Sequence, residues 1–293
     1  MKIGVIGASG FIGRAFLQVA TEAGHEVVAF SRRAQTSSPS VEWRVMGAEL
    51  DLTGLDAIVN YAGESVAQRW TAAKIALFHE SRVGVTQQLV RAIAALPEGS
   101  RPQTLLNASA VGYYGDCDDT LLDEQSPLGS GYLAELCEEW EQAAMAAEPL
   151  GVRVVLGRIG IVLGPKGEAW QKMLTAFKLG LGGPLGSGTH WMPWVHVEDV
   201  AGASLHSLIT PSLSGPLNLV SPEPQRNSDF TRALGVAVRR PAVLPAPAFA
   251  LRLVFGQFGV HLLDSYRVVP TALAESGYSF RHPKLKGCLE SMM

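Results

Sequence analysis

Cysteines are scarce in this sequence, and they follow no disulfide or metal-binding pattern. Its 293 residues include three, Cys117, Cys137 and Cys288, which are widely separated. A disulfide framework favours an even number, and a zinc site favours paired spacings such as CxxC. We therefore expect three unpaired thiols in the reducing cytoplasm, and no bound metal.

Long apolar runs are also missing. The N-terminal stretch Ile3–Ile6 is too short for a signal peptide. The most apolar later segment, Val243–Phe258, is interrupted by two prolines, an arginine and a glycine. A membrane-spanning helix needs about 18 uninterrupted apolar residues. We expect no membrane association, and an amphipathic helix at 243–258 that packs on the protein.

A surplus of positive charge is absent as well. There are 24 lysines and arginines against 27 acidic residues, which gives a net charge of -3. No basic stripe attracts nucleic acid, so binding to DNA or RNA is not expected. Hydrophobic residues make up 47% of the chain, enough for a large globular core.

Short apolar runs alternate with amphipathic segments through the first 160 residues. The runs have the length of buried strands, and the longer segments have helical spacing. We expect strands at 2–6, 25–30, 57–60, 104–108 and 152–156, and helices at 11–23, 72–96 and 133–147. This alternation predicts an α/β protein with a Rossmann doubly wound parallel sheet.

The regular alternation of strands and helices ends after Gly164. A glycine-rich loop at 180–189 follows, then a strand at 194–197 and a short helix opened by Glu198 and Asp199. We expect residues 1–164, with about 190–220, to form the Rossmann core. Residues 165–293 would mainly form a smaller C-terminal lobe that does not fold independently.

A glycine loop joins the first strand to the first helix. Its GxxGxxG spacing allows a tight turn, close approach of a pyrophosphate, and close helix–strand packing. The helix N-terminus offers unpaired N–H groups to the phosphates. The cofactor contacts expected here are Gly7, Ser9, Gly10, Phe11, Ile12 and Gly13.

The end of the second strand distinguishes between the two nicotinamide dinucleotides. An acidic residue there would bind the ribose 2′-hydroxyl of NAD, but this chain has Ser31, Arg32 and Arg33. Two guanidinium groups and a hydroxyl suit a 2′-phosphate. NADP(H) is therefore the expected cofactor, with two solvated arginines as the alternative.

Several further segments carry a family resemblance: SRR at 31–33, NYAGE at 60–64, SAVGYYGD at 109–116, CEEWE at 137–141, GRIGIVLG at 157–164, WVHVEDV at 194–200, RRPAVLPAPAFALRLVFG at 239–256 and ALAESGYSFRHP at 272–283. With these pieces the chain resembles the atypical, extended short-chain dehydrogenase/reductases of the NAD-dependent epimerase/dehydratase superfamily. The closer likeness is to the epimerase-family branch loosely named as epimerases or cell-division inhibitors. The resemblance implies an NADP-binding Rossmann core and a C-terminal substrate lobe.

The resemblance implies further site residues. It adds Asn60, Ala62 and Gly63 to the cofactor contacts. Members of the wider superfamily use a serine, a tyrosine and a lysine for acid–base catalysis, where the lysine lowers the pKa of the tyrosine. Ser109 matches the serine, and Tyr132 falls at the tyrosine position. The lysine position holds Leu136, which departs from the pattern.

Four other side chains are candidates for a substrate pocket. Tyr113 and Tyr114 follow Ser109 and can line it, with plain aromatic packing as the alternative. Arg158 can reach substrate or form a structural ion pair. His196 can serve catalysis or be a structural histidine, with Asp199 as a capping carboxylate. The loop 180–189 can close over a ligand or remain a surface loop.

The sequence is consistent with two functions. The first is an NADP-dependent oxidoreductase or epimerase acting on a small carbonyl or sugar-like substrate, with Ser109 polarising the oxygen. The second is a non-catalytic NADP(H) sensor or scaffold, motivated by the missing lysine. The substrate, the direction of reaction and the oligomeric state, with a homodimer among the options, stay open.

Overall fold

A parallel sheet forms the centre of the computed structural model, which describes residues 1–47 and 49–293. It has seven strands in the order β11-β7-β5-β4-β1-β2-β3, and every neighbouring pair is parallel. The strands are β1 (Lys2–Ile6), β2 (Glu26–Ser31), β3 (Val41–Val45), β4 (Ala57–Asn60), β5 (Thr104–Ala110), β7 (Arg153–Ile159) and β11 (Gly215–Leu219). The predicted doubly wound sheet is confirmed.

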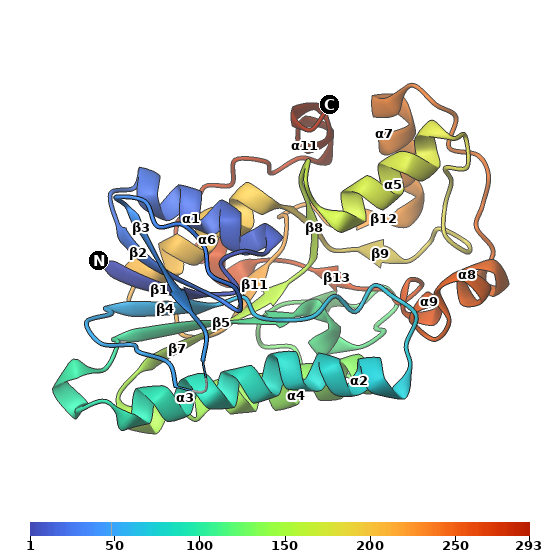
Figure 1. Cartoon of the computed structure of the whole chain (residues 1–293). Helices are drawn as coiled ribbons and strands as arrows, with labels where there is room; N and C mark the ends of the chain where they lie inside the picture. Colours follow the sequence, from blue (N-terminus) through green and yellow to red (C-terminus); the bar gives the residue numbers. More distant parts are fainter. Residues whose placement is uncertain (48) are drawn as a thin grey trace.

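Helices cover both faces of this sheet (Figure 1). On one face lie α1 (Phe11–Glu22) and α6 (Val197–Ile209), and on the other α3 (Val85–Ala95) and α4 (Tyr132–Met145). Strands covered on both faces are mostly apolar, and β1, β2 and β4 are buried along nearly their whole length, with polar residues only at their ends.

The strand order reverses between β1 and β4. From β1 the chain builds outward through β2 and β3, whereas β4 starts the other half of the sheet. The loops that leave the carboxyl ends of these two strands therefore diverge and open a crevice. In open α/β sheets, ligands bind at such a switch point.

A C-terminal lobe lies beyond the carboxyl ends of the strands (Figure 1). It contains α5 (Glu168–Lys178), α7 (Asn227–Val238), α8 (Ala248–Phe255), α9 (Phe258–His261) and α11 (Leu285–Ser291), while α10 (Thr271–Glu275) packs near β11. Its own core centres on the buried side chains of Trp170, Trp194 and Phe230. Short strand pairs tie it to the rest of the chain: β8 (Ile161–Leu163) with β10 (Trp194–His196), β9 (Trp191–Met192) with β12 (Gln225–Arg226), and β6 (Leu121–Leu122) with β13 (Arg267–Val268).

The long helix expected at 72–96 is interrupted. It consists of α2 (Ala72–His79), a π-helical turn at Glu80–Gly84, and α3. Short 3-10 turns lie elsewhere, at Glu98–Ser100, Val111–Tyr114 and Glu148–Leu150. The sequence prediction also missed β3, whose side chains alternate with charged residues at the edge of the sheet, and it made α6 too short.

The segment 243–258 differs from its prediction. Only α8 is helical before Gly256, because Pro245 and Pro247 cannot donate the backbone hydrogen bonds of a helix interior. The apolar side chains of α8 are mostly exposed, and only Leu251 is buried. In the described part of the chain, none of the helices combines the length and apolar character that a bilayer crossing requires.

Candidate functional site

The glycine loop brings three stretches of backbone close together. Gly7 has a positive φ of 75°, and a Cβ there would lie 2.8 Å from the carbonyl carbon of Tyr61. A Cβ on Gly13 would lie 2.3 Å from the carbonyl oxygen of Gly7. Only glycine permits this packing, which lays the first turn of α1 against the loop.

The N-terminus of α1 is open to an anion. Its N-cap is Gly10, which has no side chain to occupy the first N–H groups, and no acidic residue lies in the first turn. Ser9 is exposed, and its carbonyl accepts a hydrogen bond from Arg14 Nε at 2.9 Å. Phe11 and Ile12 are half-buried, and the Phe11 ring packs against Gly164 and Gly167. This geometry fits a pyrophosphate.

The end of β2 presents two unpaired cations. The buried Ser31 hydroxyl donates to the carbonyl of Arg33, which turns the chain immediately after the strand. Arg32 and Arg33 are exposed, and neither forms an ion pair with any residue in 1–47 or 49–293. Both guanidinium groups are therefore available to an anion, such as a 2′-phosphate.

Asn60 shapes the loop that follows β4. Its fully buried side-chain amide donates to Asn107 Oδ1 at 2.7 Å and to Thr86 Oγ1 at 3.0 Å. Its own Oδ1 accepts the backbone N–H of Ala62 at 3.1 Å. Asn60 thus holds Ala62, and the exposed Gly63 after it, beside the glycine loop.

A buried polar network occupies the carboxyl ends of β5 and β7. Arg158 forms a bidentate pair with Glu141, with both N–O distances at 2.9 Å. The Ser109 hydroxyl donates to Glu141 Oε1 at 2.6 Å, and Arg158 also reaches the Tyr114 hydroxyl at 3.1 Å. Burial raises the pKa of Tyr114 to about 12. The sequence prediction missed Glu141, which faces inward from α4 and joins Ser109 to Arg158.

This network engages three of the residues predicted to meet substrate. Ser109, Tyr114 and Arg158 are each at most 2% exposed, and they bind one another through Glu141 or directly. The Tyr113 ring packs on the Arg158 guanidinium, 3.5 Å from its centroid. The geometry gives these side chains structural partners, so Ser109 in particular has its hydroxyl proton already committed to a carboxylate.

Tyr132 lies apart from this network. It begins α4, its hydroxyl donates to the carbonyl of Ile75 at 3.4 Å, and its ring meets Trp70 edge-on at 5.2 Å. Burial raises its pKa, and the positive charge of Arg82 opposes that shift. Leu136, at the usual lysine position, is 4% exposed and belongs to the core.

Arg82 is a cation that the sequence prediction missed. The π-helical turn carries it, and its guanidinium lies 5.2 Å from the centroid of the Trp140 ring on α4. The same group lies 3.3 Å from where a Cβ on Gly63 would be, at the exit of β4. Its one described hydrogen bond is a long one, from Nη1 to the Phe78 carbonyl at 3.4 Å. Nothing in the sequence marks a π-helical turn, so its position was not predictable.

The C-terminal lobe adds a histidine to the same region. His261 stacks on Trp70 with ring centroids 5.1 Å apart, on an indole that also contacts Tyr132. Its Nδ1 lies 2.8 Å from Asp264 Oδ2, which also accepts the Tyr266 hydroxyl at 3.2 Å. The Nε2 atom of His261 has no hydrogen-bond partner among the described residues. A histidine oriented by a carboxylate in this way is suited to proton transfer.

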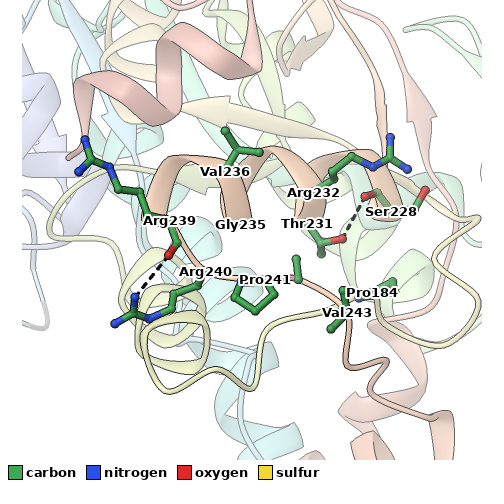
Figure 2. A pocket seen from close by; sticks show the side chains of 11 residues that line it. Pro184, Ser228, Thr231, Arg232, Gly235, Val236, Arg239, Arg240, Pro241 and Val243 are labelled. Carbon is green, nitrogen blue, oxygen red and sulfur yellow. Dashed lines mark hydrogen bonds between the residues drawn. The ribbon is translucent and has the colours of Figure 1, made fainter.

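Two hollows open on the surface of the lobe. One, of about 490 Å³, is lined by acidic, hydroxyl and basic side chains, including Asp116, Thr189, His190 and Arg226, together with both neighbours of Asp264. The other, of about 520 Å³, lies along α7 with Arg232, Arg239 and Arg240 around it (Figure 2). Arg239 and Arg240 follow the C-terminus of α7, where cations complement the helix dipole, so this second hollow needs no ligand to explain its charge.

The glycine-rich loop 180–189 is tied down at several points. Leu185 donates its backbone N–H to Asn227 Oδ1 at 2.7 Å, and Gly186 donates to the Ala246 carbonyl at 2.9 Å. The side chain of Trp191 donates to Asp119 Oδ1 at 2.7 Å, while Trp194 is buried. The loop is therefore part of the wall of the lobe in this structure.

His196 caps a helix, whereas Asp199, which was expected to be the capping carboxylate, does not. His196 is 4% exposed, and its Nδ1 accepts the backbone N–H of Glu198 at 3.3 Å, which caps α6. The Asp199 carboxylate caps no helix of its own. It accepts the backbone N–H groups of Arg281 and His282, at 2.6 and 2.9 Å, and so anchors the C-terminal segment.

Residues 3–218 match the family described as NAD dependent epimerase/dehydratase. The chain belongs to that family. Residues 246–292 also match a domain of unknown function, which begins just before α8. The family resemblance predicted from the sequence is confirmed, and the family's dinucleotide is expected at the β1–β4 switch point described above.

Individual members of the family match over almost the whole chain. An epimerase family protein of Mycobacterium bovis is 41% identical over 285 residues, which cover 96% of this chain and 93% of the relative. The epimerase family protein SDR39U1 of Bos taurus is 39% identical over 302 residues, with both chains covered completely. A crystal structure of the human SDR39U1 protein with NADPH has a TM-score of 0.90 and 34% identity, and covers 100% of this chain and 99% of that one.

Proposed function

We propose that this protein is an NADP(H)-dependent oxidoreductase or epimerase that acts on a small carbonyl or sugar-like substrate. The observation that carries the cofactor assignment is the pair Arg32 and Arg33, which are exposed and have no ion-pair partner among the described residues, together with the N-terminus of α1, which has no side-chain cap. The human relative of known structure contains NADPH, which supports the same choice.

The residues present fit such a dinucleotide. Gly7 and Gly13 allow the loop to pack closely on the chain after β4 and on α1, and the N-terminus of α1 at Gly10 carries no side-chain cap that would compete with a pyrophosphate. Arg32 and Arg33 would hold the 2′-phosphate, and Ala62 and Gly63 would line the path toward the carboxyl end of β4. When bound, NADPH supplies a hydride to an electrophilic carbon.

We assign the accompanying proton to His261. Asp264 accepts from Nδ1, so the doubly protonated ring would give its Nε2 proton to the substrate oxygen, and Nε2 has no hydrogen-bond partner among the described residues. Tyr132 is the poorer donor, because burial raises its pKa and its hydroxyl proton is directed at the Ile75 carbonyl. Ser109 does not polarise the substrate oxygen in this scheme, since its hydroxyl donates to Glu141.

The 490 Å³ hollow is the proposed substrate site. Its wall includes Leu263 and Ser265, which flank Asp264 in sequence, and so it adjoins the His261–Asp264 pair. Carboxylates, hydroxyls and Arg226 alternate around it. Such a lining suits a substrate rich in hydroxyl groups, because each hydroxyl both donates and accepts hydrogen bonds.

A second candidate function is a non-catalytic NADP(H) sensor. The buried Leu136 favours it, because the usual lysine of the catalytic helix is replaced by a core residue. A sensor must bind NADPH and NADP⁺ with unequal affinity and change the C-terminal lobe on binding.

Titrations with NADPH, NADP⁺ and NADH test the cofactor assignment. We expect NADPH to bind at least tenfold more tightly than NADH, and a failure to bind NADPH contradicts the proposal. NADPH oxidation is then followed with a panel of carbonyls and nucleotide sugars, for the wild type and for His261→Gln and Tyr132→Phe.

The two variants separate the proton donors. The proposal expects His261→Gln to lower turnover about 100-fold or more and Tyr132→Phe to preserve most of it, in line with the usual contribution of general acid catalysis. The reverse pattern would assign the proton to Tyr132. Binding without turnover on any substrate, with altered hydrogen exchange across residues 165–293, would favour the sensor.

A further inference from the structure

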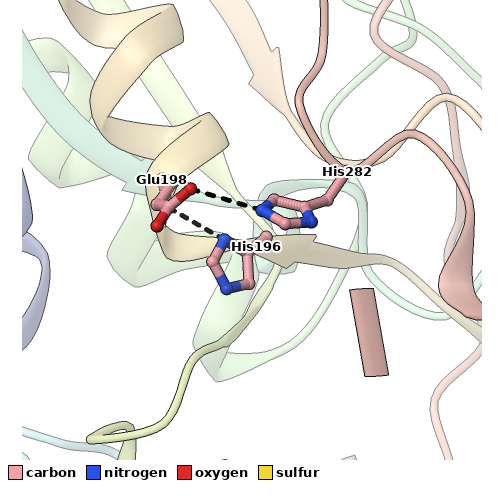
Figure 3. A group of neighbouring side chains, drawn as sticks. All are labelled: His196, Glu198 and His282. Carbon is pink, nitrogen blue, oxygen red and sulfur yellow. Dashed lines mark hydrogen bonds and ion pairs between the residues drawn. The ribbon is translucent and has the colours of Figure 1, made fainter. Parts of the chain in front are cut away.

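Two histidines and a glutamate meet where the core adjoins the C-terminal segment (Figure 3). His196 ends β10, and Glu198 lies in the first turn of α6. His282 comes from the segment between α10 and α11, 84 residues after Glu198. The first two lie within the family match at 3–218 and the third within the domain at 246–292, so the cluster bridges the two matched regions.

The spacing of these side chains matches a metal-ion site. One ligand atom from each residue lies within 4.8 Å of the other two. His282 Nε2 and Glu198 Oε2 are 3.3 Å apart, and the two imidazole rings are 4.0 Å apart between centroids. Zinc bonds to nitrogen and oxygen are about 2.0–2.1 Å long, which places neighbouring tetrahedral ligand atoms roughly 3.3 Å apart. Small side-chain rotations are enough to bring the three atoms to that separation.

The His196 ring already has the tautomer that ligation requires. Its Nδ1 accepts the backbone N–H of Glu198, so this nitrogen carries a lone pair and the neutral ring holds its proton on Nε2. A metal at Nδ1 would replace a hydrogen bond of 3.3 Å, at the long end of the normal range. The lone pair faces the side of the ring on which the Glu198 carboxylate lies (Figure 3).

Neighbouring groups hold the cluster in place. The buried Asp199 carboxylate accepts the backbone N–H of His282 at 2.9 Å, which positions that histidine next to His196. The carboxylates of Asp199 and Glu198 place negative charge next to the two histidines, which favours a bound cation. They also offset the positive end of the α6 dipole. Arg281 is the competing cation, with Nη1 3.7 Å from Glu198 Oε2, but its side chain is 63% exposed and can turn into solvent.

We propose that His196, Glu198 and His282 form a binding site for a divalent transition metal, with zinc as the best match. Two imidazole nitrogens and one carboxylate oxygen are ligands that zinc prefers, and three protein ligands leave a fourth position for water. The ion would join the N-terminus of α6 to the C-terminal segment and stabilise that contact. Our sequence prediction of no metal rested on the spacing of the cysteines. That spacing carries no information about two histidines that lie this far apart in the chain.

The test uses the full chain stripped of metal with a chelator and free of cofactor. Zinc binding is measured by calorimetry, cobalt binding by absorption in the visible range, and the melting temperature with and without zinc. We expect one ion per chain and a melting temperature that rises with zinc concentration, because the ion binds only the folded state. The cofactor plays no part in these readouts, so they fail or succeed independently of the proposed function.

Two variants remove a ligand with little change of shape, Glu198→Gln and His282→Phe. Each is expected to weaken zinc binding at least tenfold and to abolish the zinc-dependent rise in melting temperature. His206→Gln is the matched control, since His206 also lies on α6 and bonds to the C-terminal segment through Ser276. The control must bind zinc as the wild type does.

Two outcomes overturn the proposal. One is a wild-type chain that binds neither zinc nor cobalt at micromolar concentration. The other is binding that Glu198→Gln and His282→Phe leave unchanged, which would identify an adventitious ion only. Retained folding of the variants is checked by circular dichroism, so that loss of binding is read on folded protein.

Discussion

The guanidinium of Arg82 lies over the indole ring of Trp140, 5.2 Å from its centroid. Trp140 is one helical turn after Leu136, the residue at the usual lysine position of α4. A cation therefore lies near α4 on a neighbouring helix, at the exit of β4 beside Gly63. A cation over an indole face is stabilised by the ring quadrupole, and among the described residues the N–H groups of Arg82 make one hydrogen bond, a long one to the Phe78 carbonyl.

Replacing Arg82 with glutamine is expected to weaken NADPH binding about tenfold or more. Hydrogen bonds to a charged group contribute about 1.5–3 kcal/mol each, which corresponds to roughly 10- to 100-fold in affinity. Arg91→Gln is the control, because Arg91 lies on α3 and is exposed. Fluorescence titration measures both, and equal affinities for the two variants would remove Arg82 from the site.

Replacing both arginines after β2 with glutamine is expected to reduce the preference of the protein for NADPH over NADH. In the double variant Arg32→Gln and Arg33→Gln, affinity for NADPH should fall by tenfold or more while affinity for NADH stays within about twofold, since only NADPH carries a 2′-phosphate. Parallel titrations measure the preference. A loss shared by both dinucleotides would mean that these arginines stabilise the fold and do not select the cofactor.

The change Gly13→Ala is expected to abolish cofactor binding or to unfold the protein. Its Cβ would lie 2.3 Å from the Gly7 carbonyl and 2.8 Å from Ala8 Cα, and backbone atoms cannot move aside cheaply. Gly99→Ala is the control, because no atom lies within 4 Å of a Cβ there. Thermal melting and NADPH titration report both, and a Gly13→Ala protein with wild-type affinity would disprove the close packing.

Breaking the buried pair between Glu141 and Arg158 is expected to destabilise the fold. Glu141→Gln leaves a guanidinium that is 2% exposed without its counterion, which typically costs about 3–5 kcal/mol. Glu139→Gln on the same helix should cost less than about 1 kcal/mol, because its pair with His79 is solvent-exposed. Urea unfolding gives the free energy of unfolding of each variant. Similar values would show that the buried pair contributes no more than the surface one.

The predicted fold agreed closely with the structure wherever an element could be identified from a short run of consecutive residues. The strands β1, β2, β4, β5 and β7 were expected within a few residues of their bounds, because a strand buried on both faces is a short apolar run. The strand β3 escaped notice, since an edge strand with alternating charged residues resembles a loop.

The buried polar network was harder to predict. Ser109 and Arg158 lie just beyond the strands expected at 104–108 and 152–156, their partner Glu141 comes from a helix, and each of the three is at most 6% exposed. Which face of α4 turns inward is visible in its periodicity. The angle at which the helix crosses the sheet decides which of its inward residues contacts which strand. A single sequence does not reveal that angle.

The sequence by itself determined the doubly wound core and a glycine loop followed by two arginines. The glycine loop and the two arginines lie within residues 7–33, where backbone sterics and helix geometry act locally. The core follows from apolar runs that are each only a few residues long. Only the tertiary structure decided where the polar groups pair: Ser109 with Glu141, Arg82 with Trp140, and His282 with Glu198. Those pairs join residues distant in the chain, and packing of helices against the sheet selects them because burial requires each polar group to find a partner.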